Sequence, residues 1–300
     1  MTSLLFERYA EARRAEIDRV LASYLPAVSS PPEALHRAIH YALFTGGKRL
    51  RPILCLAACD AALGQRDHVL PFAAAIEMIH AYSLVHDDLP AMDNDAMRRG
   101  KPTTHKVFGE GMAILAGDAL LTAAFTLMAE VGLRSTFFAK KILSITLELG
   151  TAAGSIGMVG GQAVDMLQEG KAQMDLAVLY EMHRQKTGLL IRASVRIGAI
   201  LAGAKPKMLS ALTQYGEAVG LAFQIADDLL DVTGESSETG KPTGADAAKA
   251  KWTYPRLMGL EAARKEAQRL SEWATATLKP FGPEADILRE IAVYAVCRTR

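Results

Sequence analysis

Residues 71–88, PFAAAIEMIHAYSLVHDD, are apolar at almost every position until the stretch ends in two aspartates. Residues 218–231, AVGLAFQIADDLLD, have the same form, an apolar run that closes on aspartates. A helix that is apolar on nearly every face is buried inside a protein rather than lying along its surface. The two stretches therefore predict a pair of central helices, each with a carboxylate cluster at its end.

The rest of the 300-residue chain indicates a helical fold around this pair. Apolar residues recur at helical spacing in segment after segment, and alternating strand patterns between turn signals are almost absent. Breaks rich in glycine, proline and charge leave roughly ten to twelve helices of ordinary length. Half of the residues are hydrophobic, which is enough for a large core, and no linker-like stretch divides the chain. We expect an all-α bundle that forms a single domain over residues 1–300.

Composition and charge argue against several classes of protein. The net charge is +1 with acidic and basic residues interspersed, so we expect no nucleic-acid partner and no polybasic membrane patch. Residues 1–25 form an amphipathic pattern without the long apolar core of a secretory signal, which favours a cytoplasmic protein. The run MAILAGDALLTAAFTLMA, residues 112–129, is nearly long enough to cross a bilayer but contains Asp118. We interpret it as a core helix and expect no stable membrane insertion.

Cysteine and histidine patterns predict neither a disulfide framework nor a zinc site. Three cysteines cannot form an even set of disulfides, and Cys55 with Cys59, four residues apart in an apolar stretch, are typical of small core residues. His36 and His40 have the spacing of a helical metal pair, but no Glu follows the first histidine as it does in a zinc-protease helix. Both are expected to be surface or hydrogen-bonded histidines.

The aspartate clusters need positive charge near them, because burying an unpaired carboxylate costs roughly several kcal/mol. Asp227 and Asp231 stand four residues apart on one helical face, so both can reach one ion. Pro90 interrupts the helix before Asp93, and a bulge there could bring Asp93 back beside Asp87. Ligands that are all carboxylates favour a hard cation, and Mg²⁺ is bound in this way together with substrate phosphates. Either cluster alone could instead consist of helix-capping or surface aspartates.

Candidate phosphate-binding cations lie near helix ends and glycines. They are Lys48, Arg49 and Arg51 in GGKRLRP, Arg98 and Arg99 in RRGKPT, Lys186 in RQKTG, and Lys241 in TGKPTG. Arginine offers a planar fork to phosphate oxygens, and lysine a point charge. None of these stretches is a Walker A loop, because Lys48 is followed by arginine and no glycine stands five residues before it. Nucleotide hydrolysis is therefore not indicated, and each basic residue by itself could be a solvated surface group.

Five motifs resemble those of the short-chain trans-prenyl diphosphate synthases, most closely the bacterial farnesyl diphosphate synthases. They are GGKRLRP, DDLPAMD with RRG, GGQAVD, HRQKTG and FQIADDLLDVTGE, in the order and spacing of the family, and the resemblance extends over about residues 30–298. It implies a bundle of the isoprenoid synthase type around a deep central cavity. It also implies a homodimer and an Mg²⁺-dependent reaction with several ions in each active site, with Mn²⁺ as an alternative metal.

The implied reaction adds isopentenyl diphosphate head-to-tail to dimethylallyl or geranyl diphosphate, giving farnesyl diphosphate and inorganic diphosphate. Breaking the carbon–oxygen bond builds negative charge on the leaving diphosphate, which metal ions and fixed Lys and Arg donors stabilise. The departing diphosphate can take the final proton, so no protein base is required, and we expect His86 to be a packing residue. Geranylgeranyl or geranyl diphosphate is the alternative product.

Carried over residue by residue, the resemblance assigns roles to particular side chains. The implied metal ligands are Asp87, Asp88, Asp93, Asp227, Asp228 and Asp231. The implied isopentenyl diphosphate pocket contains Lys48, Arg51, His80 and Arg99, with Gly47 and Ser83 also binding substrate. The implied clamp on the allylic diphosphate consists of Arg98, Lys186, Lys241 and Lys251. The implied catalytic residues are Lys186, Thr187 and Gln224, and of these Thr187 and Gln224 have the oxygens that face the allylic cation.

An aromatic residue five positions before the first aspartate bears on product length. A helix rises about 1.5 Å per residue, so Tyr82 lies on the order of 7 Å below the expected metals, where its ring can act as a floor. In the family, an aromatic residue here together with the spacing of DDLPAMD resembles the type that makes farnesyl diphosphate, so Tyr82 also counts as a substrate-binding residue. Ordinary core filling is the alternative role for Tyr82.

One position departs from the family pattern, and one segment resembles a lid. Relatives often have another aspartate where this chain has Ala96, and we expect little effect of that difference on catalysis. Residues 234–251, GESSETGKPTGADAAKAK, have the composition of a mobile loop, and their lysines suggest a lid that closes over bound diphosphates. Disorder without function is the alternative for this segment.

Two other classes of protein share some of these features. A class I terpene cyclase could have a helical core and an aspartate-rich cluster, but it would not need GGKRLRP or a second diphosphate pocket. A non-catalytic subunit of a heteromeric prenyltransferase would be expected to have lost one aspartate motif, and both motifs are intact here.

Overall fold

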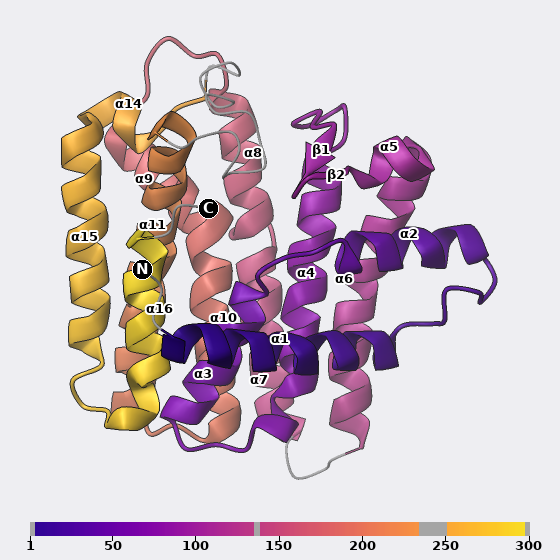
Figure 1. Ribbon diagram of the computed structural model, residues 1–300, viewed down its shortest axis with the longest axis horizontal. Coiled ribbons are helices and arrows are strands. Elements are labelled where there is room, and N and C mark those ends of the chain that lie inside the picture. The colour runs from indigo at the N-terminus through magenta and orange to yellow at the C-terminus, as the bar shows by residue number, and fades with distance from the viewer. Residues whose placement is uncertain (1–3, 135–138, 234–250, 298–300) are drawn as a thin grey trace.

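The computed structural model describes residues 4–134, 139–233 and 251–297, and most of its long helices run side by side while α1 and α2 cross them (Figure 1). The described elements are, in chain order, α1 (Leu4–Tyr24), α2 (Glu33–Phe44), α3 (Leu50–Ala61), η1 (Arg66–His68), α4 (Leu70–Asp87), β1 (Met97–Arg98), β2 (Lys101–Pro102), α5 (Thr104–Phe108), α6 (Glu110–Leu133), α7 (Ala139–Ala153), α8 (Met158–Gln168), α9 (Leu176–His183), η3 (Arg184–Gly188), α10 (Leu189–Ala202), α11 (Pro206–Thr233), α14 (Tyr254–Met258), α15 (Leu260–Thr277), η4 (Pro283–Ala285) and α16 (Asp286–Cys297). The prediction of an all-α fold is confirmed.

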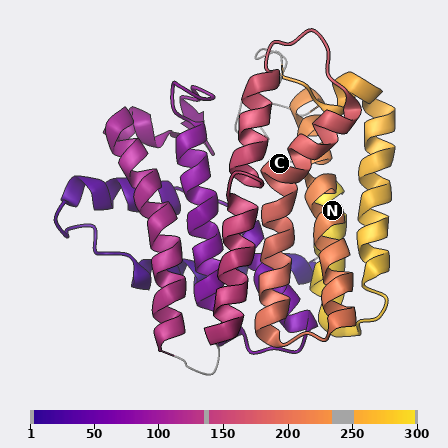
Figure 2. The same ribbon diagram turned by 180° about the vertical axis from the view of Figure 1, so that it is seen from behind.

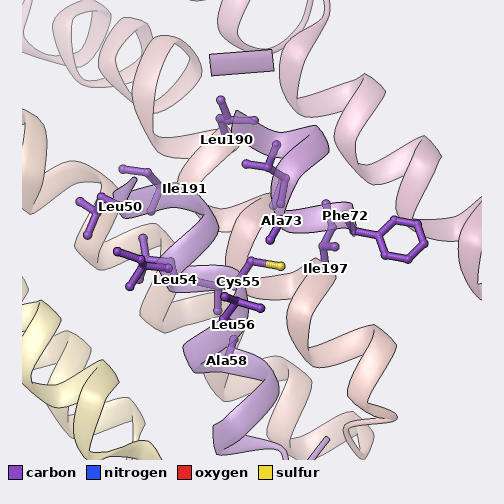
Figure 3. Close-up of a cluster of buried hydrophobic side chains, with 14 of the residues drawn as sticks. Leu50, Leu54, Cys55, Leu56, Ala58, Phe72, Ala73, Leu190, Ile191 and Ile197 are labelled. Carbon is purple, nitrogen blue, oxygen red and sulfur yellow. The ribbon is translucent and has the colours of Figure 1, made fainter. Parts of the chain in front are cut away.

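Helix α4 lies in the interior of the bundle, as its composition predicts. Every residue from 72 to 79 is buried, and α4 packs against α1, α3 and α6. Figure 3 shows Phe72 and Ala73 among apolar side chains of α3 and α10. Burial on this scale holds the helix rigidly, so the aspartates that follow it start from a fixed position.

Helices α3 and α10 approach each other so closely that their backbones are in contact. A Cβ atom built on Gly198 of α10 would lie 1.9 Å from the carbonyl oxygen of Cys55 in α3, so only glycine fits there. Cys55 and Cys59 are free and buried, which confirms that they are core residues. Figure 3 shows Cys55 beside Leu54 and Leu56 in this cluster.

The two histidines with metal-compatible spacing hold the chain that leads into α2. Nδ1 of His36 lies 2.7 Å from the carbonyl oxygen of Ser30, and Nε2 of His40 lies 2.9 Å from that of Pro26. Both histidines are thus hydrogen-bonded to backbone, as the sequence predicts.

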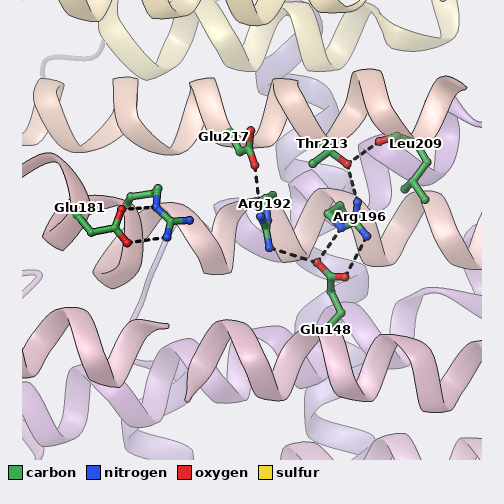
Figure 4. A network of polar contacts seen from close by, with 8 residues as sticks. Glu148, Glu181, Arg192, Arg196, Leu209, Thr213 and Glu217 are labelled. Atoms are coloured by element: carbon green, nitrogen blue, oxygen red, sulfur yellow. Dashed lines mark hydrogen bonds and ion pairs between the residues drawn. The ribbon is translucent and has the colours of Figure 1, made fainter. Parts of the chain in front are cut away.

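A polar network ties α7, α10 and α11 together (Figure 4). Arg196 of α10 donates from Nε to Glu148 of α7 at 2.8 Å and from Nη1 to Thr213 of α11 at 2.7 Å. Arg192, one turn earlier on α10, donates to Glu217 of α11 at 3.3 Å. Since a fork-shaped arginine fixes both distance and direction, this network sets the position of α11, which carries the second aspartate cluster.

Helix α6 is only partly a core helix, which corrects the interpretation of residues 112–129. Its inner face packs against α4, but Ile114, Leu115 and Leu133 are exposed, with Leu133 at 86%. By length and composition α6 and the stretch Ala139–Gln168 are each apolar enough to cross a membrane, and 39% of each apolar window is buried in the described structure. The apolar residues occur on all sides of α6, whereas the protein covers one side.

Candidate active site

The chain turns sharply at the end of α4 and brings together two aspartates of the first cluster. The backbone leaves the helix before Pro90, and the N–H of Asp93 donates to the carbonyl oxygen of Asp87 at 2.8 Å. Asn94, with a left-handed φ of 50°, donates from its N–H to Leu89 at 3.0 Å and closes the turn. The bulge predicted from Pro90 is confirmed.

Cationic side chains neutralise part of this acidic region. Nε of Arg98 lies 2.8 and 2.9 Å from the two carboxylate oxygens of Asp88. Lys251 donates from Nζ to Asp93 at 2.8 Å, across 158 positions of sequence. A buried carboxylate needs a positive partner, and here the protein itself supplies part of the positive charge that the sequence led us to expect from metal ions.

Asp165 at the inner face of α8 lies between two of the expected diphosphate-binding lysines. Its Oδ2 accepts from Nζ of Lys186 at 2.7 Å and lies 3.6 Å from Nζ of Lys251. Burial by itself raises the pKa of Asp165, but the two ammonium groups hold the pKa below its usual range. The sequence prediction gave Asp165 no role, although it is the last residue of the GGQAVD motif.

The carboxyl of Asp87, unlike that of Asp165, has a raised pKa. The pKa of its carboxyl is raised to about 6, chiefly by burial; Lys186 and Arg98 oppose this rise, and Asp93 and Asp88 contribute to it. A carboxylate whose charge is disfavoured by burial and by like charges gains most from an added cation. Asp87 is therefore the member of the first cluster best suited to attract a metal ion.

A two-residue hairpin presents the arginines of RRG. Strands β1 and β2 pair antiparallel with Arg98 opposite Lys101, and Arg99 and Gly100 at the turn have positive φ of 54° and 74°. This is the geometry of a tight hairpin turn that favours glycine at its second position. The turn directs Arg98 toward Asp88 and lets Nη1 of Arg99 donate to the carbonyl oxygen of Gly46.

The GGKRLRP motif separates its cations into different roles. Nη1 of Arg51 lies 3.3 Å from Nε2 of His80. Burial lowers the pKa of His80 well below its usual range, with Arg51, Arg99 and Arg98 adding to the effect, so His80 is neutral beside these arginines. Nζ of Lys48 lies 5.5 Å above the ring of Tyr294, and its expected contact with diphosphate stays a prediction.

Arg49, in contrast, is a buried structural residue. Its guanidinium donates to Asp18 at 2.8 Å, to Glu77 at 2.8 Å and to the carbonyl oxygen of Leu43 at 2.6 Å. Glu77 is the single acidic residue in the buried part of α4, between positions 72 and 79, and that isolated charge was the sequence signal for a buried partner. The pair anchors the GGKRLRP loop between α2 and α3 to the central helix.

The HRQKTG motif forms a π-helical segment, η3, in which Lys186 and Thr187 lie. Such wide turns are frequent at functional sites because they displace side chains from the regular helical positions. A Cβ on Gly161 of α8 would lie 2.2 Å from the backbone nitrogen of Lys186, and one on Gly220 of α11 would lie 2.8 Å from Cα of Gly188. Two neighbouring helices therefore enclose η3 closely, and glycine makes both approaches possible.

Thr187 and Gln224 are brought together by a hydrogen bond between their side chains. Thr187 lines the main cavity and donates from Oγ1 to Oε1 of Gln224 at 2.8 Å. Gln224 is partly exposed and donates from Nε2 to Asp228 at 3.0 Å, and its expected position facing the allylic cation stays a prediction. The structure thus makes Gln224 a neighbour of the cavity-lining hydroxyl.

The second aspartate cluster is divided by its surroundings. The side chain of Asp228 is buried, accepts from the backbone N–H of Tyr254 at 2.9 Å, and lies 3.7 Å from Nε2 of His183. Asp227 and Asp231 are each partly exposed. His183 stacks on Tyr254 with ring centroids 5.6 Å apart, a contact that sequence reasoning missed because the two residues are far apart in the chain.

A cavity of about 530 Å³ opens between α4, α6, α8 and η3. Its wall includes seven of the expected site residues, namely Arg51, His80, Tyr82, Ser83, Asp87, Lys186 and Thr187. Most of the remaining wall is apolar, with Ile114 from α6 and Met158 and Val159 from α8. Such a lining suits a hydrocarbon chain whose charged end lies at the aspartates.

His86 packs against α6 at the edge of this cavity. Its Nε2 lies 3.1 Å from the carbonyl oxygen of Ile114, and a Cβ on Gly117 would lie 2.1 Å from the same nitrogen. The prediction that His86 is a packing residue rather than a base agrees with this position.

The oxygen donors of the aspartates determine which metal the site could hold. Among the described residues no three His, Cys, Asp or Glu side chains form a group able to hold one ion by themselves. The available donors are carboxylate oxygens, and Mg²⁺ is bound by one or two carboxylates, waters and substrate phosphate oxygens. The aspartates fit an Mg²⁺ ion that shares its ligands with a diphosphate.

Three expected assignments remain, those of Gly47, Lys241 and the lid segment. Gly47 lies against Arg99, since a Cβ on it would meet the guanidinium at 2.5 Å. Lys241 and the predicted lid lie in residues 234–250, outside the described residues, except that Lys251, the last residue of the lid segment, contacts Asp93.

Comparisons with known proteins bear on this site. The family described as Polyprenyl synthetase matches residues 32–281. A farnesyl diphosphate synthase of Geobacillus stearothermophilus is 46% identical over 267 residues, 89% of each chain. A geranylgeranyl diphosphate synthase of Cyanophora paradoxa is 43% identical over 290 residues, 97% of this chain and 95% of that one. The crystal structure of an FPP/GFPP synthase from Zymomonas mobilis is 41% identical with a TM-score of 0.87 and covers 98% of this chain and 99% of that one.

Proposed function

Because this chain belongs to the polyprenyl synthetase family and is a trans-prenyl diphosphate synthase, we propose that its product is farnesyl diphosphate. In this proposal isopentenyl diphosphate is joined head-to-tail to dimethylallyl diphosphate and then to geranyl diphosphate. Relatives of similar identity are named for farnesyl and for geranylgeranyl diphosphate, so the family by itself does not choose between these products.

The position of Tyr82 is the observation that carries the farnesyl assignment. Tyr82 lies on the cavity wall, is 6% exposed, and precedes Asp87 on α4 by five residues, or about 7 Å along the helix. Its ring packs edge-on against His86 at 5.8 Å between centroids. A buried aromatic ring at this depth limits the length of the hydrocarbon chain above it.

The two ends of the cavity suggest where each substrate binds. The allylic diphosphate would lie at the aspartates, where Lys186, Lys251 and Arg98 can exchange their carboxylate partners for phosphate oxygens. Isopentenyl diphosphate would lie against Arg51 and Arg99, with neutral His80 as a hydrogen-bonding group. This arrangement directs the double bond of one substrate at the allylic carbon of the other.

Bond changes in the proposed reaction need no protein base. The allylic carbon–oxygen bond breaks, and its electron pair leaves with the diphosphate. The double bond of isopentenyl diphosphate then forms the new carbon–carbon bond, and a proton passes to the released diphosphate. The oxygen of Thr187 faces the site of positive charge, and the apolar wall excludes water that would otherwise capture the cation.

Mg²⁺ is the metal we propose, with Asp87, Asp93, Asp227 and Asp231 as its protein ligands. When bound, it would supply positive charge against the leaving diphosphate. Asp88 and Asp228 are buried, whereas the other four aspartates are partly exposed, and we therefore place Asp88 and Asp228 outside the ligand set.

We also propose a homodimer through the exposed apolar face of α6 and α7. Ile114 and Leu115 of α6 and Leu143 and Leu147 of α7 are 44% to 72% exposed, and Figure 2 shows the two helices side by side toward the viewer. A face of this kind is more typical of an interface than of free surface. Sedimentation analysis of wild type and of Leu143→Glu tests this interface. Wild type should sediment as a dimer and the variant as a monomer, and equal masses for wild type and the variant would contradict the proposal.

The test of the activity is a product assay. Purified protein is incubated with Mg²⁺, labelled isopentenyl diphosphate, and either dimethylallyl or geranyl diphosphate, and the products are separated by chain length. We expect farnesyl diphosphate from both allylic substrates, and none after addition of a chelator. A longer product would contradict the role of Tyr82, while absence of any condensation would contradict the proposed activity itself.

A further inference from the structure

Three hydrogen bonds connect the cavity wall to the backbone beyond α11. Thr187 donates to Oε1 of Gln224 at 2.8 Å, Nε2 of Gln224 donates to Oδ1 of Asp228 at 3.0 Å, and the N–H of Tyr254 donates to Oδ2 of Asp228 at 2.9 Å. Thr187 is the member that lines the cavity. The other three, Gln224, Asp228 and the backbone of Tyr254, follow it in the chain of hydrogen bonds.

The direction of every bond in this chain is determined by its buried end. A carboxylate has only acceptor positions, so Asp228 forces Gln224 to turn its NH₂ group outward and its carbonyl oxygen toward Thr187. The hydroxyl of Thr187 must then donate to that carbonyl oxygen. As a result its lone pairs, rather than its hydrogen, remain available toward the cavity.

We propose that Asp228 is a positioning residue that acts through Gln224 to orient the hydroxyl dipole of Thr187 toward the allylic cation. The inference rests on the proposed function, because it assigns the dipole a cation to face. The negative end of a fixed dipole stabilises positive charge that develops in a site shielded from water. Asp228 thus contributes to ionisation without touching substrate.

The surroundings of Asp228 distinguish this role from metal binding. Its side chain is 3% exposed, each oxygen accepts an N–H, and Nε2 of His183 adds a third nitrogen at 3.7 Å. Asp227, its neighbour in sequence, is partly exposed. A metal shared with a diphosphate requires ligands that are accessible to both, which favours the partly exposed Asp227 for that function.

The substitution Asp228→Asn should reverse the chain of hydrogen bonds. The N–H of Tyr254 requires an acceptor, so the amide oxygen of the new side chain stays there and its NH₂ group faces Gln224. Gln224 must then turn its carbonyl oxygen outward and its NH₂ group toward Thr187. The hydroxyl of Thr187 now accepts, and its hydrogen points into the cavity, where it opposes a cation.

A second substitution can restore the original direction. In Asp228→Asn/Gln224→Glu, one oxygen of the new carboxylate accepts from the amide at 228 and the other accepts from Thr187. The total charge of the pair is unchanged. A metal site that had lost Asp228 would not be repaired by this change, because the restored carboxylate stands at position 224, one helical turn from 228.

The kinetic test compares wild type, Asp228→Asn, the double variant, and Asp227→Asn as the example of a lost ligand. We expect kcat of Asp228→Asn to fall on the order of a hundredfold, with unchanged KM values and an unchanged Mg²⁺ concentration for half-maximal rate. The double variant should recover to within roughly tenfold of wild type, while Asp227→Asn should require more Mg²⁺. A raised Mg²⁺ requirement in Asp228→Asn without rescue would overturn the proposal, as would full activity of that variant. Thermal melting checks that each variant is folded.

A binding test does not depend on turnover. Calorimetry with Mg²⁺ measures two non-reactive probes, an aza analogue of the allylic diphosphate with a positive nitrogen and its neutral carbon analogue. Wild type and the double variant should prefer the cationic probe, and Asp228→Asn should lose that preference. An equal loss of affinity for both probes in Asp228→Asn would indicate that Asp228 is a metal ligand and would overturn the inference. Failure of wild type to bind either probe would instead contradict the proposed function.

Discussion

Replacing His183 by phenylalanine should remove part of the sensitivity of this protein to acid. The imidazole is buried against Tyr254, and neither of its nitrogens has a hydrogen-bond partner among the described residues. The pKa of His183 is lowered from 6.5 to about 3, chiefly by burial; Asp165 opposes this lowering, and Lys186 and Lys251 contribute to it. The folded protein therefore keeps His183 neutral over a range of pH in which the unfolded chain protonates it.

The magnitude follows from this difference in pKa. Between pH 6.5 and about 3 the unfolded state binds a proton that the folded state does not, so the free energy of unfolding decreases as the pH falls. Each pKa unit corresponds to about 1.4 kcal/mol. At pH 5, about one and a half units below the unfolded pKa, His183 should cost about 2 kcal/mol relative to pH 7.

Urea unfolding of wild type and His183→Phe at pH 7 and pH 5 measures this cost. Phenylalanine keeps a ring that can stack on Tyr254 and has no group that titrates. His80 and the carboxyl groups titrate in both proteins, so their contributions cancel in the comparison. Wild type should lose about 2 kcal/mol more than the variant between the two pH values. Equal losses would refute the reasoning, because they would mean that His183 is not held neutral by burial.

The remaining predictions concern the cavity and η3. Tyr82→Ala should lengthen the products by opening the cavity, and Tyr82→Phe should leave them unchanged because the ring remains. Chromatography of the products measures their chain length. Identical products from both variants would contradict the role of Tyr82 as the floor of the cavity. Gly161→Ala should lower activity by roughly tenfold or more, because its Cβ would lie 2.2 Å from the backbone nitrogen of Lys186. Gly111→Ala in α6 is the matched control, since a Cβ there meets nothing within 4 Å, and it should keep full activity; equal activity of the two glycine variants would show that η3 tolerates the displacement.

The all-α fold could be predicted because hydrophobic periodicity is a property of neighbouring residues. The continuous apolar sequence of α4 identified it as an interior helix, and residues 72–79 are all buried. The same reasoning was wrong about part of residues 112–129 in α6, where Ile114 and Leu115 are exposed. An apolar residue indicates that burial is favourable, but whether another element covers it depends on the packing of the whole bundle.

The candidate site was predictable as a set of residue types and less so as a set of contacts. Lys251 was expected to bind a diphosphate, and it pairs with Asp93, 158 positions away. Arg49 was grouped with the candidate phosphate-binding cations, yet it is buried against Glu77. Asp165 was missed altogether. Each pairing joins segments that meet only when the core is packed.

By itself the sequence determined the chemistry of this protein: the helical class, two carboxylate clusters, the cations near glycines, and an aromatic residue below the first cluster. Only the tertiary structure decided which carboxylate faces which partner. Asp87 lines the cavity while adjacent Asp88 is buried against Arg98, and Asp228 is enclosed by nitrogen donors while adjacent Asp227 is partly exposed. A helix turns about 100° with each residue, so neighbours of identical type point toward different surroundings. Those surroundings come from distant parts of the chain and fix the role of each aspartate.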